Sequence, residues 1–475
     1  MKGKATNVET TNAETRATDT ANGKATNAVN WRAPVIRAAL WLTGSSVPDN
    51  LRTIRRLWRS DRETVDRYRA AKLTRLLRHA HATVPYYSDV LEEAGVVDGE
   101  EVFLENFQEI PILTRETLRE ERQRLQSSDP GPDPYRNTTS GSTGVPVEFV
   151  QDDHYWAWNV ATKLFYQELA GKSLGEPEVK LWGSVRDLEE GSTSIRTRAM
   201  NFLYNRRELN SYRMGDAQMR AHVRAINEVE PTSIWTYVHS MEQLAKYVQR
   251  TGTPVHSPRA VITTAGTLNE PVRERIERVF DTRVHNQYGS REVGDVACEC
   301  PAQDGLHCFP HAAYVEIVDG NGDVRPAGEN GRIAVTSLNN FSMPLIRYEI
   351  GDMGIASAEP CRCGRPFPTL ERVTGRRTDH FTTPDGDLVN PFYLEDSLYY
   401  LEWFDRFRIR QTSRDHVVYL FERRSGQEPP SSDLEEIEAA TRRLLGDTVD
   451  VSFEFPDRIE ENDSGKYRYS ISEVT

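Results

Sequence analysis

The sequence is poor in lysine, in cysteine and in long apolar runs. Only nine of its 59 basic residues are lysines, and no basic block stands out that would neutralise phosphates along a nucleic acid strand. The net charge of −13 likewise argues against a nucleic-acid partner. No stretch approaches the roughly 20 apolar residues of a membrane-spanning helix, and the N-terminus lacks the order of a signal peptide. We therefore expect no nucleic-acid partner and no membrane span.

The stretch VIRAALWLTG (35–44) comes nearest to an apolar segment, but it is short and contains Arg37. We interpret it as a core-packing or surface helix. The five cysteines are an odd number in a chain without a secretory signal, which indicates a reducing compartment. We therefore expect a cytoplasmic protein whose thiols are free or bound to a metal.

The length of 475 residues and the hydrophobic content of 37% predict two or three folding units. Residues 1–30 are rich in Thr, Asn and Ala with almost no large apolar side chain, so we expect a disordered tail. In residues 31–375 strand-like runs alternate with helical patterns, which indicates a large α/β domain. One unit reads RAVITTAG, NEPVRERIERVFD and RVHNQYG, a strand, a helix with Pro271 in its first turn and a second strand.

Turn pairs between residues 314 and 350 separate short β-rich runs, which predicts a subdomain built of hairpins. Residues 376–475 change character again and predict a small α+β domain. There, FRIRQTSRDHVVYLFERR reads as a hairpin and VDVSFEF as a strand. Between them, DLEEIEAATRRLLG reads as a helix that is capped by Asp433 and closed by Gly446.

A hydroxyl-rich stretch, NTTSGSTGVPVEF, is followed at once by strand-like alternation. Its glycines let the backbone approach a ligand closely, and its hydroxyls add donors to the free N–H groups of a turn. Such a loop can hold phosphate oxygens, although it lacks the Gly-Lys-Ser/Thr ending of a P-loop. Taken alone, a run of this kind is more often a flexible polar loop.

Three other residues are candidate site residues, but each indicates a function only when it is considered together with the others. Glu292, in QYGSREVG, follows a predicted strand and turn and offers a carboxylate suited to Mg²⁺. Asp352, just after Gly351, is well placed to accept hydrogen bonds from a ribose diol. Taken singly, both are more often turn residues at the surface. Lys466 is the only lysine after Lys246, which indicates that a compact point charge is needed there.

Six stretches in this order, TTSGSTGVP, TTAGTLNEP, QYGSREVG, RYEIGD, GRRTD and SGKYR, resemble the motifs of the adenylate-forming superfamily of acyl-CoA ligases. The resemblance is greatest to the phenylacetate-CoA ligase-like branch, which includes the CapK-type capsular polysaccharide proteins, and it spans nearly the whole chain after the tail. It implies an α/β fold: a large N-terminal adenylation domain with helices, mixed sheets and a β-rich subdomain, and a small mobile α+β C-terminal domain.

The resemblance also implies roles for individual residues. Ala265 and Gly266 would line the adenine pocket, with Tyr288 and Gly289 beside the adenine. Glu292 would reach Mg²⁺, and Asp352 would hold the ribose hydroxyls. Arg376 would lie in the segment that joins the domains, and Lys466 would serve adenylation. Thr378 stands where many relatives carry Asp or Lys, so the chain departs from the common pattern at the hinge. The β- and γ-phosphates of ATP would be wrapped by Thr139, Ser140, Gly141, Ser142, Thr143 and Gly144.

Two cysteine clusters, CECPAQDGLHC and CRC, carry candidate metal ligands. Thiolate and imidazole ligands suit tetrahedral Zn²⁺, and a site made only of protein ligands is structural. For an isolated Cys-x-Cys pair, buried free cysteines are the simpler interpretation. In the phenylacetate-CoA ligase-like branch the corresponding segments form a zinc site, which implies Cys300, His307, Cys361 and Cys363 as ligands. Cys298 and Cys308 are the alternatives.

The resemblance implies that the chain activates an aryl or related carboxylic acid with ATP, through an acyl-adenylate, and then forms a thioester with coenzyme A. A second hypothesis changes the acceptor to a deazaflavin coenzyme, which receives AMP, or to an amine on a sugar. A third is a nucleotide-binding protein of polysaccharide assembly without turnover, which would not need Lys466, Glu292 and Asp352 together. A homodimer is left open. Aromatic side chains at this spacing are more often part of the core. If they instead line the acid pocket, the candidates are Tyr155, Trp156, Trp158, Trp235, Tyr237 and His239.

Overall fold

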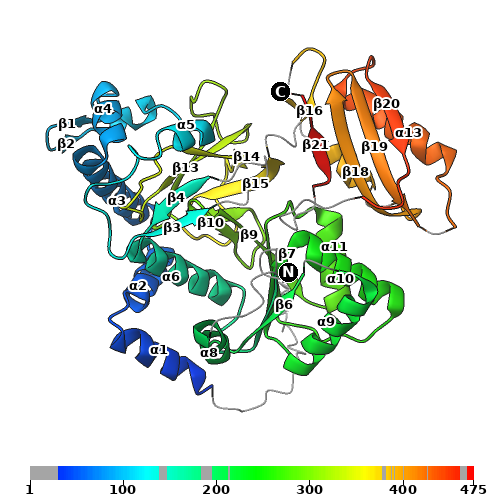
Figure 1. Cartoon of the computed structure of the whole chain (residues 1–475), viewed down its shortest axis with the longest axis horizontal. Helices are drawn as coiled ribbons and strands as arrows, with labels where there is room; N and C mark the ends of the chain where they lie inside the picture. Colours follow the sequence, from blue (N-terminus) through cyan, green and yellow to red (C-terminus); the bar gives the residue numbers. More distant parts are fainter. Residues whose placement is uncertain are drawn as a thin grey trace, which may run out of the picture.

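The computed structural model describes residues 30–138, 147–182, 195–211, 214–376, 381–386, 388–389, 391–398, 401–424, 426–459 and 468–474. The tail expected for residues 1–30 therefore lies outside the described residues, except for Asn30. The described chain forms a large lobe up to Arg376 and a small lobe from Phe381 onward (Figure 1).

A mixed sheet of eleven strands runs through the large lobe in the order β12-β13-β14-β15-β11-β10-β9-β8-β7-β5-β6. In this order, the neighbouring strands from β12 to β9 pair antiparallel. The neighbouring strands from β9 to β6 pair parallel. The parallel strands are β5 (Glu178–Trp182), β6 (Arg206–Asn210), β7 (Ser233–Tyr237), β8 (Ala260–Thr264) and β9 (Arg283–Ser290). The others are β10 (Gly294–Glu299), β11 (Leu306–Cys308), β12 (Ala313–Val318), β13 (Asn330–Ser337), β14 (Tyr348–Ala356) and β15 (Thr369–Arg376). This arrangement confirms the expected α/β class with a hairpin-built part.

Helices cover the sheet, and two short hairpins lie beside it. The first helices are α1 (Arg32–Leu42), α2 (Val47–Trp58), α3 (Arg62–Thr83), α4 (Pro85–Glu93), the 3₁₀ helix η1 (Leu104–Glu109) and α5 (Arg115–Glu120). The later helices are α6 (Asp153–Leu169), α8 (Ile195–Leu203), α9 (Asp216–Val229), α10 (Val238–Thr251) and α11 (Glu270–Phe280). The hairpins pair β1 (Val97–Asp98) with β2 (Glu101–Val102) and β3 (Tyr135–Thr138) with β4 (Glu148–Gln151).

Local sequence signals explain where helices next to the site begin. The Asp152 carboxylate accepts a hydrogen bond from the backbone N–H of Tyr155 at 2.8 Å and so caps α6. Pro271 lies in the first turn of α11, where its missing N–H costs nothing. Val272, Ile276 and Phe280 are buried on one face of α11, as the helical spacing predicts.

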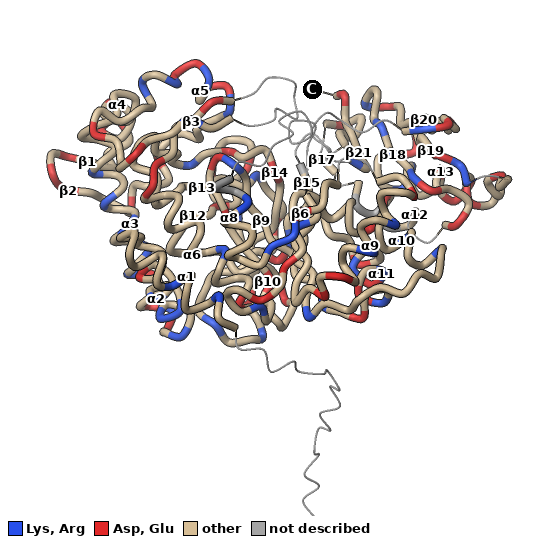
Figure 2. Tube along the Cα trace, turned by 60° about the horizontal axis from the view of Figure 1, so that its bottom comes forward, with Lys and Arg blue, Asp and Glu red and all other residues tan. Residues whose placement is uncertain are grey.

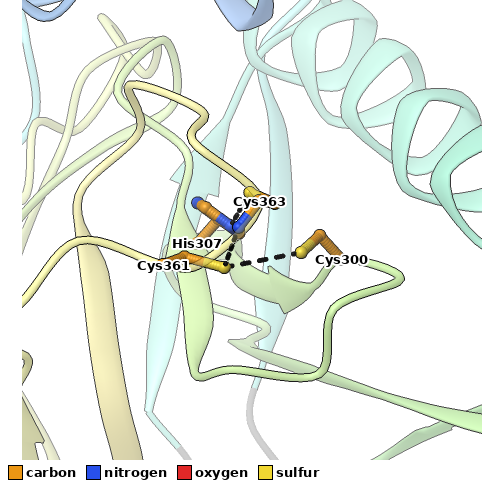
Figure 3. A group of neighbouring side chains, drawn as sticks. All are labelled: Cys300, His307, Cys361 and Cys363. Carbon is orange, nitrogen blue, oxygen red and sulfur yellow. Dashed lines mark hydrogen bonds between the residues drawn. The ribbon is translucent and has the colours of Figure 1, made fainter. Parts of the chain in front are cut away.

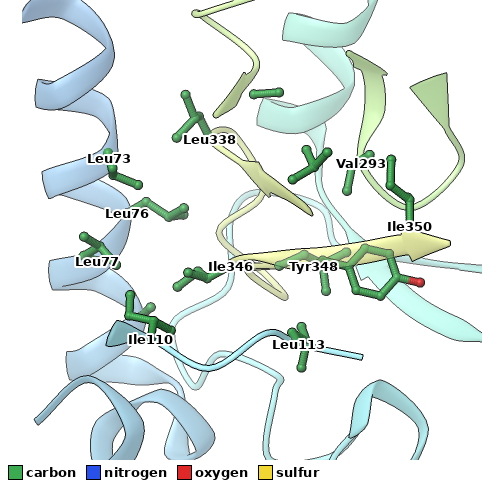
Figure 4. Packing of buried hydrophobic residues seen from close by; sticks show 14 of the residues in the cluster. Leu73, Leu76, Leu77, Ile110, Leu113, Val293, Leu338, Ile346, Tyr348 and Ile350 are labelled. Carbon is green, nitrogen blue, oxygen red and sulfur yellow. The ribbon is translucent and has the colours of Figure 1, made fainter. Parts of the chain in front are cut away.

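Helix α3 packs its apolar face against the β-rich part of the large lobe (Figure 4). Leu73, Leu76 and Leu77 point from α3 toward Ile346 and Tyr348 in the same buried cluster. The burial of each leucine contributes on the order of 2 kcal/mol, so this contact holds the RYEIGD strand in place.

Strand β14 is also held by the fully buried Arg347. Its guanidinium donates to Glu316 at 3.2 Å and to the carbonyl oxygens of Ile110 at 2.6 Å and Gly322 at 2.7 Å. Charge-assisted hydrogen bonds to a carboxylate and to two separate loops fix the start of β14, the strand that contains Asp352.

The small lobe contains a four-stranded sheet in the order β20-β19-β18-β21. The hairpin β18 (Phe404–Ser413) and β19 (His416–Arg423) and the strand β20 (Asp450–Glu454) lie where the sequence predicts them, with α13 (Ser431–Leu445) between them. The expected cap Asp433 is instead in the first turn, where it accepts from the Trp403 indole at 3.0 Å, and the helix begins at Ser431. The other elements are β16 (Phe381–Thr382), β17 (Leu388–Val389), α12 (Phe392–Leu398) and β21 (Ser470–Ser472).

Charged residues of both signs are interspersed along the described trace (Figure 2). Within that trace, no helix has both the length and the apolar composition that a bilayer crossing requires. The stretch VIRAALWLTG (35–44), which was expected to be a core-packing or surface helix, forms most of α1. Its Trp41 is 76% exposed at the surface.

Candidate active site

The carboxyl ends of the parallel strands meet at one edge of the large sheet. Tyr237 and Thr264 are partners where β7 and β8 end, and Thr263 pairs with Asn286 on β9. In parallel α/β sheets ligands bind at this edge. Ala265, just after β8, has a φ of +59°, and a Cβ on Gly266 would lie 3.2 Å from the Cβ of Val238. The two residues expected at the adenine therefore form a tight turn at this edge.

The hydroxyl-rich loop begins beside the turn that carries Glu292. Thr139, Ser140, Gly141, Ser142, Thr143 and Gly144 lie outside the described residues, but both strands that flank them are described. The Arg291 guanidinium donates to the carbonyl oxygen of Thr138 at 3.2 Å. The Gln151 amide donates to the carbonyl oxygen of Arg291 at 2.8 Å. Both bonds tie the base of the β3–β4 hairpin to the turn between β9 and β10.

Glu292 is buried, with 3% of its surface exposed. Its Oε1 lies 3.5 Å from the Arg115 guanidinium and 3.4 Å from the Tyr348 hydroxyl, both of which donate to it. One cation at this distance balances part of the carboxylate's charge without closing a tight ion pair. The sequence analysis missed Arg115 and Tyr348 as site residues, although Tyr348 stands in RYEIGD, one of the six stretches that resemble the family.

The residues expected at the adenine and the ribose lie side by side. The Tyr288 hydroxyl donates to Oδ2 of Asp352 at 2.9 Å. A side chain on Gly289 would collide with the carbonyl oxygen of Gly294, so glycine is required for the β9–β10 hairpin to close. Asp352 pairs in register with Arg376, the last residue of β15, so the expected ribose ligand is next to the segment that leads to the small lobe.

The aromatic residues expected to line an acid pocket do not form one wall. Trp235 and Tyr237 are buried on β7 and lie 5.4 Å and 4.1 Å, ring to ring, from Trp182 at the end of β5. Trp182 was missed by the sequence analysis because it stands alone in its stretch. Trp158 instead packs in the core beneath Lys72, whose Nζ lies 4.0 Å from the ring centre. Trp156 is 44% exposed, so only part of the expected wall lies at the strand ends.

Buried polar groups lie between α6 and the β9–β10 hairpin. Asp295 accepts from the Gln287 amide at 2.7 Å through Oδ1, while its Oδ2 has no hydrogen-bond partner within the described part of the chain. Burial raises the pKa of this carboxyl group. The buried Asn159 Oδ1 also has no partner there, and it would lie 3.4 Å from a Cβ on Gly294. Two buried acceptors without donors destabilise a protein unless a ligand or water supplies the donors.

Four candidate metal ligands come together from separate parts of the chain (Figure 3). The ligand atoms of Cys300, His307, Cys361 and Cys363 all lie within 4.8 Å of one another. The Cys300 and Cys361 sulfurs are 3.7 Å apart, and the Cys363 sulfur is 3.3 Å from Nε2 of His307. Zn–S bonds of about 2.3 Å in a tetrahedron place two sulfurs about 3.8 Å apart, so the donor set fits zinc.

The surroundings of the cluster also suit a metal. Nδ1 of His307 lies 3.3 Å from the carbonyl oxygen of Phe367, and an N–H donated there leaves Nε2 as the ligand atom. Backbone N–H groups of Ala302 and Cys363 donate to the sulfurs of Cys300 and Cys361 at 3.4 Å and 3.5 Å. Burial raises the pKa of Cys300 to about 12, and a bound cation is what stabilises a thiolate there.

Lys466 lies outside the described residues, as does Thr378. The chain is described again from Arg468, and Tyr469 just before β21 contacts the large lobe through Glu242 on α10. The described chain from Arg468 onward is therefore attached to the large lobe at Tyr469.

The sequence is similar to those of known ligases over most of its length. It is 26% identical to a phenylacetate-coenzyme A ligase of Pseudomonas putida over 373 residues, which cover 75% of this chain and 80% of that protein. It is 20% identical to protein CapK of Staphylococcus aureus over 393 residues, 82% of this chain and 85% of that protein. No family model matches the chain.

The fold is also similar to that of solved ligase structures. A crystal structure of 2-hydroxyisobutyryl-CoA ligase in the postadenylation state matches with a TM-score of 0.70 and 19% identity, over 88% of this chain and 91% of that one. The same enzyme in its thioesterification state gives 0.56 and 20% identity, over 88% and 92%. The chain therefore has the fold of this CoA ligase, and its sequence is similar to those of phenylacetate-coenzyme A ligases.

Proposed function

We propose that this protein activates a carboxylic acid with ATP through an acyl-adenylate and then passes the acyl group to the thiol of coenzyme A. The relatives in Pseudomonas putida, Thermus thermophilus and Escherichia coli are phenylacetate-coenzyme A ligases, which supports an aryl or related acid. The observation that carries the proposal lies at the carboxyl end of β9, where Tyr288 bonds to Asp352 and Arg291, next to Glu292, bonds to the carbonyl oxygen of Thr138.

The residues divide the work of the first step between them. The acid's carboxylate attacks the α-phosphorus of ATP, and pyrophosphate leaves. The loop from Thr139 to Gly144 offers N–H and hydroxyl donors to the β- and γ-phosphates. Asp352 accepts from the ribose hydroxyls, and the Tyr288 hydroxyl bound to it orients that carboxylate. Lys466 supplies positive charge where negative charge accumulates in the transition state.

We also propose that Glu292 is a ligand of Mg²⁺. Its buried carboxylate is a hard oxygen donor, and the Arg115 guanidinium stands 3.5 Å from it. Mg²⁺ would neutralise phosphate charge during adenylation. Arg115 and the Tyr348 hydroxyl hold Oε1 of Glu292 in a fixed orientation.

The exchange of labelled pyrophosphate into ATP tests the first step directly. We expect exchange only in the presence of a suitable acid, and we expect Lys466→Met to slow it by about 100-fold or more because the charge at the transition state is lost. Lys24→Met, in the N-terminal tail, is the matched control and should leave exchange unchanged. Exchange at the wild-type rate in Lys466→Met would show that this lysine does not serve adenylation.

A different acceptor is the second candidate, and the similarity to CapK over 82% of the chain favours it. In that case the acyl group would pass to an amine on a sugar rather than to coenzyme A. Incubation of the enzyme, ATP and the best acid with equal concentrations of coenzyme A and an amino sugar separates the two. Thioester as the main product supports the first candidate, and amide as the main product supports the second.

We propose that Cys300, His307, Cys361 and Cys363 bind a structural Zn²⁺. The spacing of the sulfurs and the donor set support the proposal, as does the fixed orientation of His307. The metal would connect the end of β10 to the loop between β14 and β15. These strands flank the Tyr288–Asp352 pair, so its role would be to stabilise both sides of the nucleotide site. Thiols held for a metal also support the cytoplasm as the place of action.

We further propose that residues 31–375 and 376–475 are the two domains of the enzyme, with the hinge near Arg376. Strand β15 ends at Arg376, and the next described residue is Phe381 in the small lobe. A short connection of this kind suits the swing between adenylation and thioester formation that the family resemblance implies.

A further inference from the structure

A partly buried hydrogen bond joins the small lobe to the large one. The Tyr469 hydroxyl donates to Oε2 of Glu242 on α10 at 2.5 Å, and Nδ1 of His239 lies 3.4 Å from the same hydroxyl. A second bond crosses the same interface, where Lys246 donates to the carbonyl oxygen of Asp405 on β18 at 3.3 Å. Figure 1 shows β18 and β21 of the small lobe lying over α10 and α11.

Glu242 is a strong acceptor for this bond. It is completely buried, and Lys246 and Arg275 lie 3.0 Å and 3.1 Å from its Oε1. Burial by itself would raise the pKa of this carboxyl, but these cations, with His239 and the Tyr469 hydroxyl, lower it to about 2. The group is therefore an anion at any physiological pH, and a hydroxyl bound to a buried anion is held more firmly than one bound to a neutral acceptor.

Tyr469 is itself firmly attached to the small lobe. Its carbonyl oxygen accepts from the backbone N–H of Ile409 at 2.7 Å, and the Arg408 guanidinium donates to the carbonyl oxygen of Arg468 at 3.1 Å. The Tyr469 ring lies 5.2 Å from that of Phe407. Since Lys466 is three positions earlier in the chain, the place where Tyr469 docks restricts where Lys466 can reach.

On the other side of the interface, the acceptor is next to the candidate site. Helix α10 begins directly after Tyr237, the last residue of β7, and Glu242 is one turn along it. The bond therefore links the chain near Lys466 to the strand edge at which the nucleotide site is built.

We propose that Tyr469 and Glu242 are positioning residues that hold the small lobe in the arrangement in which Lys466 serves acyl-adenylate formation. The proposal rests on the proposed function. Because the hydroxyl and the carboxylate belong to different lobes, a swing of the small lobe for thioester formation must break their bond. The bond thus favours acyl-adenylate formation and opposes the movement of the small lobe that thioester formation requires.

Tyr469→Phe tests the proposal, because it removes the hydroxyl and keeps the ring. We expect pyrophosphate exchange to slow by about 10- to 100-fold, the effect of losing one hydrogen bond to a charged group. Thioester formation from acyl-adenylate that is supplied ready-made should be no slower than in the wild type. Tyr419→Phe is the matched control, since the buried Tyr419 hydroxyl bonds to Thr441 at 2.6 Å within the small lobe, and we expect both half-reactions to stay close to wild type.

Hydrogen–deuterium exchange of the free protein gives a readout that does not depend on activity. In Tyr469→Phe, peptides from residues 238–251 and 404–413 should exchange faster than in the wild type, and in Tyr419→Phe they should not. The proposal is overturned if Tyr469→Phe changes neither the exchange of these peptides nor the first half-reaction, or if it slows both half-reactions equally. If the wild type shows no pyrophosphate exchange with any acid, the proposed function fails, and the peptide exchange alone decides whether Tyr469 fastens the lobes.

Discussion

Loss of the proposed zinc from the Cys300–His307–Cys361–Cys363 cluster should destabilise the large lobe strongly. Cys300 and Cys361 are about 60 positions apart, and a cross-link that closes a loop of this length restricts the unfolded chain by about 4 kcal/mol. A structural zinc binds the folded chain much more tightly than the unfolded one, so its binding free energy adds to the stability of the fold. We therefore expect Cys361→Ser to lower the free energy of unfolding by about 4 kcal/mol.

Cys361→Ser should also weaken ATP binding at the nucleotide site. Cys300 follows β10, which pairs with the strand of Tyr288, and the Cys361–Cys363 loop leads into β15, which pairs with the strand of Asp352. A loosened cluster lets these strands shift apart, so the Tyr288–Asp352 bond weakens. We expect KM for ATP to rise with little change in KM for the acid.

Metal analysis and urea unfolding check this prediction. The purified protein should contain one zinc per chain, Cys361→Ser should contain less, and its unfolding midpoint should shift to lower urea. Cys308→Ala is the control, because Cys308 is buried but lies outside the cluster and should cost only about 1 kcal/mol of packing while the zinc stays bound. A wild-type protein without zinc, or a Cys361→Ser variant that unfolds at the wild-type urea concentration, would refute the reasoning.

Three further predictions concern single residues. Glu292→Gln should slow pyrophosphate exchange by about 100-fold, because an amide lacks the charge that Mg²⁺ requires, while the circular dichroism spectrum stays the same; exchange near the wild-type rate contradicts the role. Asp352→Asn should raise KM for ATP by about tenfold with little effect on kcat, measured by steady-state kinetics, and an unchanged KM would exclude a ribose contact. Burial lowers the pKa of His239 to about 3 and that of His285 to about 4, so the unfolded chain takes up protons that the folded one excludes. As the pH falls from about 6.5 toward these values, the free energy of unfolding should drop by about 1.4 kcal/mol per pH unit per histidine. Urea unfolding at several pH values should show this slope, and His285→Gln should make it shallower; a stability that does not change below pH 6.5 would contradict the assignment.

Local patterns in the sequence were sufficient for several elements and for the resemblance to the ligases. Helix α11 and the hairpin of β18 and β19 follow from spacing, turn residues and caps, which act within a few positions of the chain. The six motifs likewise point to the adenylate-forming ligases, because each is a short stretch whose residue types suit one part of the nucleotide. The first turn of α13 was misjudged, since Asp433 bonds to the distant Trp403 rather than to its own helix.

Contacts between distant segments were decided only by the tertiary structure. The sequence left Cys298 and Cys308 as alternative ligands. Successive residues on β11 face opposite sides, so His307 turns to the cluster and Cys308 to the core. Cys298 is opposite His307 in the register, and the four ligand atoms that come together do not include its sulfur. The neighbours of Glu292, the place of Trp182 beside Tyr237, and the Tyr469–Glu242 bond depend in the same way on how strands and lobes pack. The spacing of residues within one segment does not predict such contacts, because folding brings together partners that are far apart in the sequence.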